Sequence, residues 1–64
     1  MLHNYSPTAL LTEEQAAELL ALSVRTLQAW RLRGAGPRYV RAGRAIRYQQ
    51  IELVEWISAN TVTR

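Results

Sequence analysis

The sequence predicts a mainly α-helical domain with one small β-hairpin. Three observations support this fold class: two short helical segments that each begin at a capping residue, a third amphipathic segment near the C-terminus, and a glycine turn flanked by β-branched and aromatic residues. The chain has 64 residues, of which 48% are hydrophobic, and this length suits a single packed domain. It contains no cysteine, so packing has to stabilise the fold without disulfide bonds or thiolate metal sites.

The first predicted helix spans Glu13 to Leu20 and follows an arm, residues 1–10, that we expect to be mostly loose because it shows no helical period. Thr12 and Gln15 have the spacing of a capping box. Glu13 falls in the first turn, where the helix dipole favours a negative charge. The residues expected to face the core are Leu10, Leu11, Ala16, Ala17 and Leu20.

The second predicted helix runs from Val24 to Arg33, with Ser23 as its N-cap and Gly34 as its C-terminal stop. Only residues 21–23 separate it from the first helix. Two short helices joined by about three residues have the layout of a helix-turn-helix. The core stripe of this second helix is predicted to comprise Val24, Leu27 and Trp30.

A β-hairpin and a last helix complete the predicted domain, which spans residues 11–59. The hairpin covers residues 38–48 with a tight turn at Ala42-Gly43. The last helix runs from about Gln49 to Ala59, and residues 60–64 form a polar tail. Its core-facing residues are expected to be Leu53, Trp56 and Ile57.

The charged residues are segregated along the chain. All eight basic residues are arginine, and seven of them lie between Arg25 and Arg47 with no acidic residue among them. This block raises the local potential far more than the net charge of +3 suggests. A polyanion is therefore the expected partner, with a merely solvated basic surface as the alternative.

Enzymatic, metal-binding and membrane functions find little support. The chain lacks Asp, Lys and Cys, has no glycine-rich phosphate loop, and carries its carboxylates on expected solvated helix faces, so we predict no catalysis, cofactor or small-molecule substrate. His3 has no second ligand near it in sequence and receives no metal role. No segment approaches the roughly 18 apolar residues of a membrane span or has the layout of a signal peptide, so a cytoplasmic location is expected.

These motifs, in their order and spacing, resemble excisionase-type, or MerR-like, winged helix-turn-helix domains of phages and mobile elements. The resemblance implies that the second helix enters the major groove, that the hairpin is a wing over the backbone or adjacent minor groove, and that the last helix braces the core. The matching segments are Leu11 to Leu20, Ser23 to Leu27 with Trp30, Gly34, Gly36-Pro37, Tyr39 to Arg44, and Ile46 to Tyr48 with Leu53 and Trp56-Ile57.

Three positions depart from the pattern of that family. Ala21 stands where a glycine is common in the turn between the helices. Ala29 replaces a commonly basic residue on the second helix, which removes one expected phosphate contact. Ile51 stands where Ser or Asp often caps the last helix, so the start of that helix is left open.

The second helix is expected to carry the residues that read DNA. Arg25 suits guanine O6 and N7, Gln28 suits adenine N6 and N7, and Thr26 suits a thymine methyl group or a phosphate. A phosphate contact without sequence information is the alternative for Arg25. Ser23 is expected to cap the helix, and its hydroxyl also suits a phosphate. The full predicted DNA-binding set is Ser23, Arg25, Thr26, Gln28, Ala29, Arg31, Arg41, Arg44 and Arg47.

The arginines outside the reading positions have other expected roles. Arg44, beside a glycine at the hairpin turn, suits a narrow minor groove. Arg47 alternates with a core residue and is expected to point outward. Arg31, Arg33 and Arg38 bracket the end of the second helix, where they suit flanking phosphates, although Arg31 and Arg33 also simply favour the helix dipole.

The aromatic and apolar residues separate into a core and a second surface. Trp30, Tyr39 and Trp56 are expected to form core rather than to stack on nucleic-acid bases. The apolar residues Leu32, Ile51 and Val54 are predicted to be exposed and, following the excisionase resemblance, to contact an integrase or a neighbouring copy bound head to tail on DNA.

The predicted function is sequence-specific binding of double-stranded DNA by an excisionase, also called a recombination directionality factor. The resemblance implies that such a protein bends attachment-site DNA and assists an integrase in excision. A small phage-type transcriptional regulator of the same fold is the alternative, and a protein-interaction adaptor is the second alternative.

Overall fold

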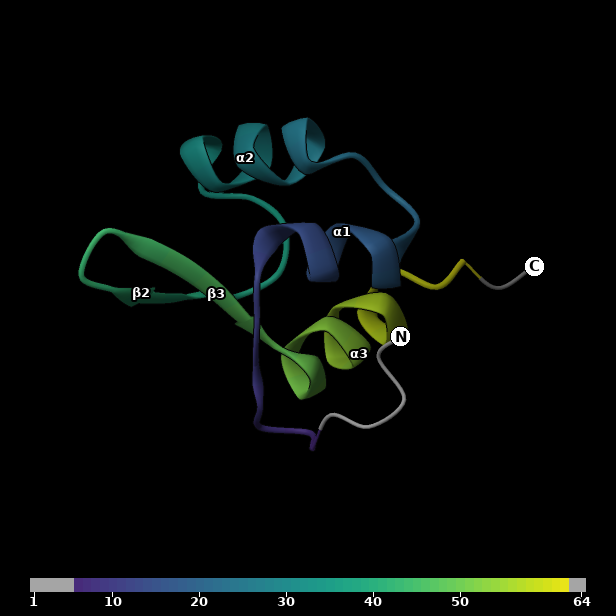
Figure 1. The fold of residues 1–64 in the computed structure, drawn as a ribbon. Coiled ribbons are helices and arrows are strands. Elements are labelled where there is room, and N and C mark those ends of the chain that lie inside the picture. The colour runs from purple at the N-terminus through teal and green to yellow at the C-terminus, as the bar shows by residue number, and fades with distance from the viewer. Residues whose placement is uncertain (1–5, 63–64) are drawn as a thin grey trace.

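The computed structural model describes residues 6–62. Three helices lie together and a long hairpin projects away from them (Figure 1). His3 and the rest of residues 1–5 of the predicted arm lie outside the described residues, as do residues 63–64 of the predicted tail. The elements in chain order are β1 (Leu10–Leu11), α1 (Glu13–Leu20), α2 (Val24–Arg33), β2 (Val40–Ala42), β3 (Ala45–Gln49) and α3 (Gln50–Ala59).

Helix α1 has the predicted bounds and the predicted cap. The Thr12 side chain accepts a hydrogen bond from the Gln15 backbone N–H at 3.1 Å, and the Gln15 side chain accepts one from the Thr12 N–H at 2.9 Å. The helix ends at Ala21, whose φ of 58° and ψ of 41° are left-handed. Because a Cβ atom makes this conformation unfavourable, the alanine at this usual glycine position carries backbone strain.

Helix α2 also has its predicted bounds. The Ser23 side chain accepts a hydrogen bond from the Thr26 N–H at 3.1 Å, which confirms the predicted N-cap. Gly34, with a φ of 72°, ends the helix at its C-cap. Glycine adopts this left-handed conformation without a steric penalty, so α2 ends without the backbone strain found at the end of α1.

The three strands form one antiparallel sheet in the order β1-β3-β2. Ala42 pairs with Ala45, so the two-residue loop is Gly43-Arg44, one position later than the predicted Ala42-Gly43 turn. The reason is that Gly43 has a φ of 66° and occupies the first loop position, where a type II′ turn requires glycine. Strand β1 was not predicted, because two residues carry no periodic signal.

Residues 6–10 are attached to the domain, in contrast to the mostly loose arm that the sequence suggests. The backbone oxygen of Pro7 accepts a hydrogen bond from the Ile51 N–H at 2.9 Å, and that of Thr8 accepts one from the Gln49 Nε2 at 3.1 Å. Gln49, the N-cap of α3, makes no side-chain cap. The Pro7 carbonyl therefore satisfies an amide of the first turn of α3, a task that a Ser or Asp side chain commonly performs.

The core lies between α1, α2, α3 and the sheet. Leu11, Leu27, Tyr48 and Leu53 are its largest fully buried side chains, and Ala16, Ala17 and Ile46 complete it. Tyr48 was not predicted as core, although it follows Ile46 at i+2 and so shares the face of β3 that the expected outward direction of Arg47 already assigned to the core. The predicted core alanines of α1 are confirmed.

The remaining predicted core residues occupy the margin of the core. Trp30 and Trp56 are half-buried and their rings meet with centroids 5.2 Å apart. Tyr39 is 38% exposed, although its ring centroid lies 6.2 Å from that of Tyr48, so its assignment to the core was wrong. Leu10 was also expected inside and is 49% exposed. Ile57 was also predicted as core and is 41% exposed, because it lies in the wall of an open apolar groove between α1, α2 and α3.

Candidate nucleic-acid interface

The solvent-facing side of α2 is formed by four exposed residues at helical spacing. Arg25, Gln28, Ala29 and Leu32 follow one another at i, i+3, i+4 and i+7, which places them on one face of the helix. We call this set the α2 outer face. Leu27 on the opposite side is fully buried. The structure therefore brings three of the predicted readers together and leaves them open to solvent.

Leu32 is the most exposed large hydrophobic residue among those described, at 80%. It was grouped with Ile51 and Val54 as a protein-contact surface. Those two residues are exposed on α3, whereas Leu32 continues the α2 outer face one turn beyond Gln28. Sequence reasoning grouped three exposed apolar residues that come from two different helices.

The start of α2 presents two hydroxyl groups. The Ser23 Oγ and Thr26 Oγ1 lie 2.9 Å apart in hydrogen-bond contact, and the Ser23 side chain also accepts from the Thr26 backbone. Ser23 is exposed, whereas Thr26 is partly buried. Both hydroxyls are therefore ordered by the cap, next to backbone amides that suit an anion.

Arg31 occupies a setting that the sequence did not predict. Its Nη2 lies 3.2 Å and its Nε 3.4 Å from the Glu13 Oε2. The two side chains are only 17% and 15% exposed, respectively. Arg31 was placed in the predicted DNA-binding set, but its guanidinium is turned inward to α1 and forms an ion pair there.

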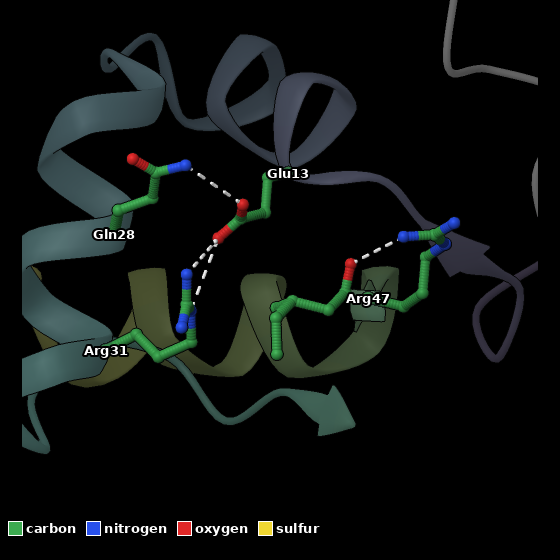
Figure 2. A network of polar contacts seen from close by, with 5 residues as sticks. Glu13, Gln28, Arg31 and Arg47 are labelled. Atoms are coloured by element: carbon green, nitrogen blue, oxygen red, sulfur yellow. Dashed lines mark hydrogen bonds and ion pairs between the residues drawn. The ribbon is translucent and has the colours of Figure 1, made fainter. Parts of the chain in front are cut away.

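Glu13 also contacts a predicted reader. The Gln28 Nε2 lies 3.4 Å from the Glu13 Oε1, so Gln28 and Arg31 both reach from α2 to one carboxylate (Figure 2). Sequence reasoning assigned Glu13 only to the helix dipole. The available signal was the i, i+3 spacing of Gln28 and Arg31, which puts them on one side of α2, together with an acid at the start of the preceding helix.

Two tyrosines enclose this cluster from the hairpin side. The Arg31 Cζ lies 6.0 Å from the centre of the Tyr39 ring, a cation–π distance. Burial, and after it the negative charge of Glu13, raises the pKa of Tyr48 above its ordinary value of 10.0. Glu13 thus acts electrostatically on residues of both α2 and β3.

The hairpin arginines differ in how open they are. Arg41 and Arg44 are exposed, and Arg44 lies in the turn at the tip of the hairpin. Arg47 was expected to point outward, but it is half-buried and its Nη1 donates to the Ile46 carbonyl at 2.8 Å. Figure 2 shows its guanidinium lying apart from the Glu13 carboxylate.

Arg38 lies outside the predicted DNA-binding set and has an acidic setting. It is exposed in an open groove whose wall also contains Glu52 and Glu55 of α3. These acidic side chains weaken the positive potential around Arg38, whereas the α2 and hairpin sequences, which carry the other exposed arginines, contain no acidic residue.

Two further observations concern other kinds of site. Within residues 6–62, no group of three or more His, Cys, Asp or Glu side chains is close enough to hold a metal ion. In the same part of the chain, none of the helices has the length and apolar character needed to cross a membrane.

Comparison with known proteins places this geometry in a family. A family model described as a helix-turn-helix domain matches residues 10–61, which includes every strand and helix of the fold. A search of curated proteins finds no match. The family is generally non-catalytic, and a helix-turn-helix domain implies DNA as the partner. The chain belongs to the helix-turn-helix domain family.

Proposed function

We propose that the protein binds double-stranded DNA sequence-specifically, with α2 in the major groove and the β2–β3 hairpin over the backbone or the adjacent minor groove. The α2 outer face is the observation that supports this most: it combines an exposed Arg25 and Gln28 in a helix that contains no acidic residue. Arginine and glutamine are side chains that pair with guanine and adenine in the major groove. Arg44 at the hairpin tip suits the minor groove.

Within this function, we propose the role of an excisionase that bends attachment-site DNA and assists an integrase in excision. The support is the resemblance of the sequence motifs and the small size of the domain. Ile51 and Val54 are the residues proposed to contact an integrase or a neighbouring copy, because both are exposed on α3 and away from the α2 outer face.

Selection of bound sequences from random and genomic DNA, followed by footprinting, tests these proposals. Tandem sites in one orientation beside an integrase attachment region are expected for the excisionase. Inverted repeats at a promoter would instead identify a transcriptional regulator. If no sequence is enriched at low salt, the DNA-binding proposal is wrong and a protein-interaction adaptor becomes the better interpretation.

The contact surface on α3 needs its own variants. Ile51→Glu and Val54→Glu are expected to reduce cooperative binding on long DNA and to leave affinity for a single site nearly unchanged. Ala59→Glu, at an exposed position of the same helix outside the face shared by Ile51 and Val54, is the matched control for added charge. Equal loss of single-site affinity and cooperativity in the two variants would mean that these residues stabilise the fold instead.

A further inference from the structure

We infer that Glu13 is a positioning residue for DNA sequence recognition: it fixes the orientation of the Gln28 amide and withholds Arg31 from the DNA backbone. This inference rests on the proposed function and adds to it a residue outside the recognition helix. Glu13 belongs to the first turn of α1 and was not among the predicted DNA-binding residues.

Both carboxylate oxygens of Glu13 are used toward α2. Oε2 accepts from the Arg31 Nη2 at 3.2 Å and Nε at 3.4 Å, and Oε1 faces the Gln28 Nε2 at 3.4 Å. The carboxylate and guanidinium are largely shielded from water, which strengthens their attraction relative to an exposed pair. Gln28 itself remains exposed. One end of its amide group therefore contacts an anchored charge, while the rest stays accessible.

The amide contact decides which edge Gln28 offers to a base. A primary amide has two N–H donors and one oxygen acceptor. Pairing with adenine uses the oxygen and the N–H on the same side, toward N6 and N7. The second N–H is then free to face Glu13. The opposite flip would bring Oε1 of Gln28 against the carboxylate, an unfavourable contact between acceptors, so Glu13 selects the orientation before DNA arrives.

The ion pair has a second consequence for DNA. Arg31 is neutralised by Glu13 in the free protein, so it does not add to the phosphate contacts of the exposed arginines. Removing Glu13 frees the guanidinium for a phosphate. Affinity for unrelated DNA is then expected to rise while discrimination between bases falls, two changes of opposite direction that simple loss of folding does not produce.

The test compares Glu13→Ala with Glu14→Ala, Gln28→Ala and the Glu13→Ala/Gln28→Ala double variant. Glu14 is the matched control, since it is an exposed carboxylate in the same first turn. The probes are the duplex selected by the wild-type protein, its single base-pair substitutions and an unrelated duplex. Thermal melting of each variant without DNA establishes the temperature at which all are folded.

We expect Gln28→Ala to lose about 5-fold or more of the discrimination at one base pair. Glu13→Ala is expected to lose about 3-fold at that same pair, a part of the value of the Gln28 contact. In the Gln28→Ala background, Glu13→Ala is expected to change discrimination little further, because the side chain that Glu13 positions is absent. The slope of log affinity against log salt on unrelated DNA should become steeper by about 0.9 in Glu13→Ala, the value for one further phosphate.

A second readout needs no DNA. In the nitrogen–proton NMR spectrum, the Gln28 side-chain amide signals should shift in Glu13→Ala and stay in place in Glu14→Ala. If Glu13→Ala does not fold, Glu13→Gln keeps the size of the side chain and removes its charge, and the same losses are expected at smaller amplitude.

The possible outcomes separate this inference from the proposed function. Absence of any enriched sequence for the wild-type protein overturns the proposed function and this inference with it. An enriched sequence, together with unchanged discrimination in the Glu13 variants, overturns this inference alone. Equal effects of Glu13→Ala and Glu14→Ala would also overturn it, because they would reveal a general effect of acidic charge near DNA.

Discussion

Replacing Ala21 by glycine should stabilise the protein, because the alanine holds a backbone conformation that suits glycine. Ala21 has a φ of 58° and is the one described residue other than glycine with a positive φ. Its N–H donates to the Glu18 oxygen at 3.1 Å, and the Leu22 N–H donates to the Ala17 oxygen at 2.9 Å. These two bonds are those of a Schellman motif, which fixes the left-handed residue at the helix end.

The magnitude follows from two opposing effects. A non-glycine residue in the left-handed region costs about 1–2 kcal/mol. Glycine makes the unfolded chain more flexible, which offsets about 0.4–1 kcal/mol of the gain. Ala21 is exposed, so little apolar burial is lost with its methyl group. We expect a net gain of about 0.5–1 kcal/mol in the free energy of unfolding, which corresponds to an increase of about 2–8 °C in Tm for a domain of this size.

Thermal and urea denaturation, followed by circular dichroism and tryptophan fluorescence, measures this gain. Gly34→Ala is the reciprocal control: Gly34 has a φ of 72° at the end of α2, and a Cβ there would meet no atom within 4 Å. It should lose a similar amount through backbone strain alone. If Ala21→Gly is neutral or destabilising while Gly34→Ala is destabilising, the strain assigned to Ala21 is not present.

Three further predictions concern DNA, pH and packing. If about five arginines contact phosphates, the slope of log affinity against log salt in filter binding should be near −4.5, and a slope near zero would exclude this mode of binding. The raised pKa of Tyr48 means that the unfolded state loses its phenolic proton first, so unfolding free energy should fall as pH rises above about 10 and on through the folded pKa, in alkaline denaturation. Tyr48→Phe should remove that part of the slope, whereas an unchanged slope would refute the assignment to Tyr48. Gly36→Ala should destabilise by about 1–3 kcal/mol, because its Cβ would lie 2.9 Å from a carbon of the Trp30 ring at a φ of 83°. Gly43→Ala is the control, because a Cβ there has open space and only the strain of its positive φ should lower stability. Equal losses of unfolding free energy in the two variants would contradict the role of Trp30.

The helices were predictable because their ends are marked by local chemistry. The Thr12 capping box, the Ser23 cap and Gly34 act within one turn of the residues that they cap. A few adjacent residues are therefore enough to predict where each helix begins or ends. The turn was predicted one residue too early because the local sequence allows Gly43 in either of the two loop positions. The pairing of Ala42 with Ala45 resolves it.

The parts that sequence reasoning missed depend on contacts between distant segments. Strand β1 and the Pro7 carbonyl that caps α3 are separated from their partners by about forty positions, and neither has a side-chain pattern of its own. Glu13 and Arg31 meet because α1 packs on α2. The spacing of Gln28 and Arg31 puts both on one side of α2, but it does not fix which residue of α1 they meet. The predicted fold class is confirmed without these contacts, whereas the ion pair of Arg31 with Glu13 could be found only in the folded structure.

The arrangement of charge in space differs from its arrangement in the sequence. The arginine block contains no acid along the chain, yet folding brings Glu13 onto Arg31 and places Arg38 in a groove with α3 carboxylates. Arg47 is bound to a neighbouring carbonyl. The arginines that remain exposed between positions 25 and 47 are Arg25, Arg33, Arg38, Arg41 and Arg44. Because Arg38 shares its groove with two carboxylates, five phosphate contacts and a salt slope near −4.5 are the upper limit without Arg31. A slope steeper by about 0.9 in Glu13→Ala would report the release of Arg31.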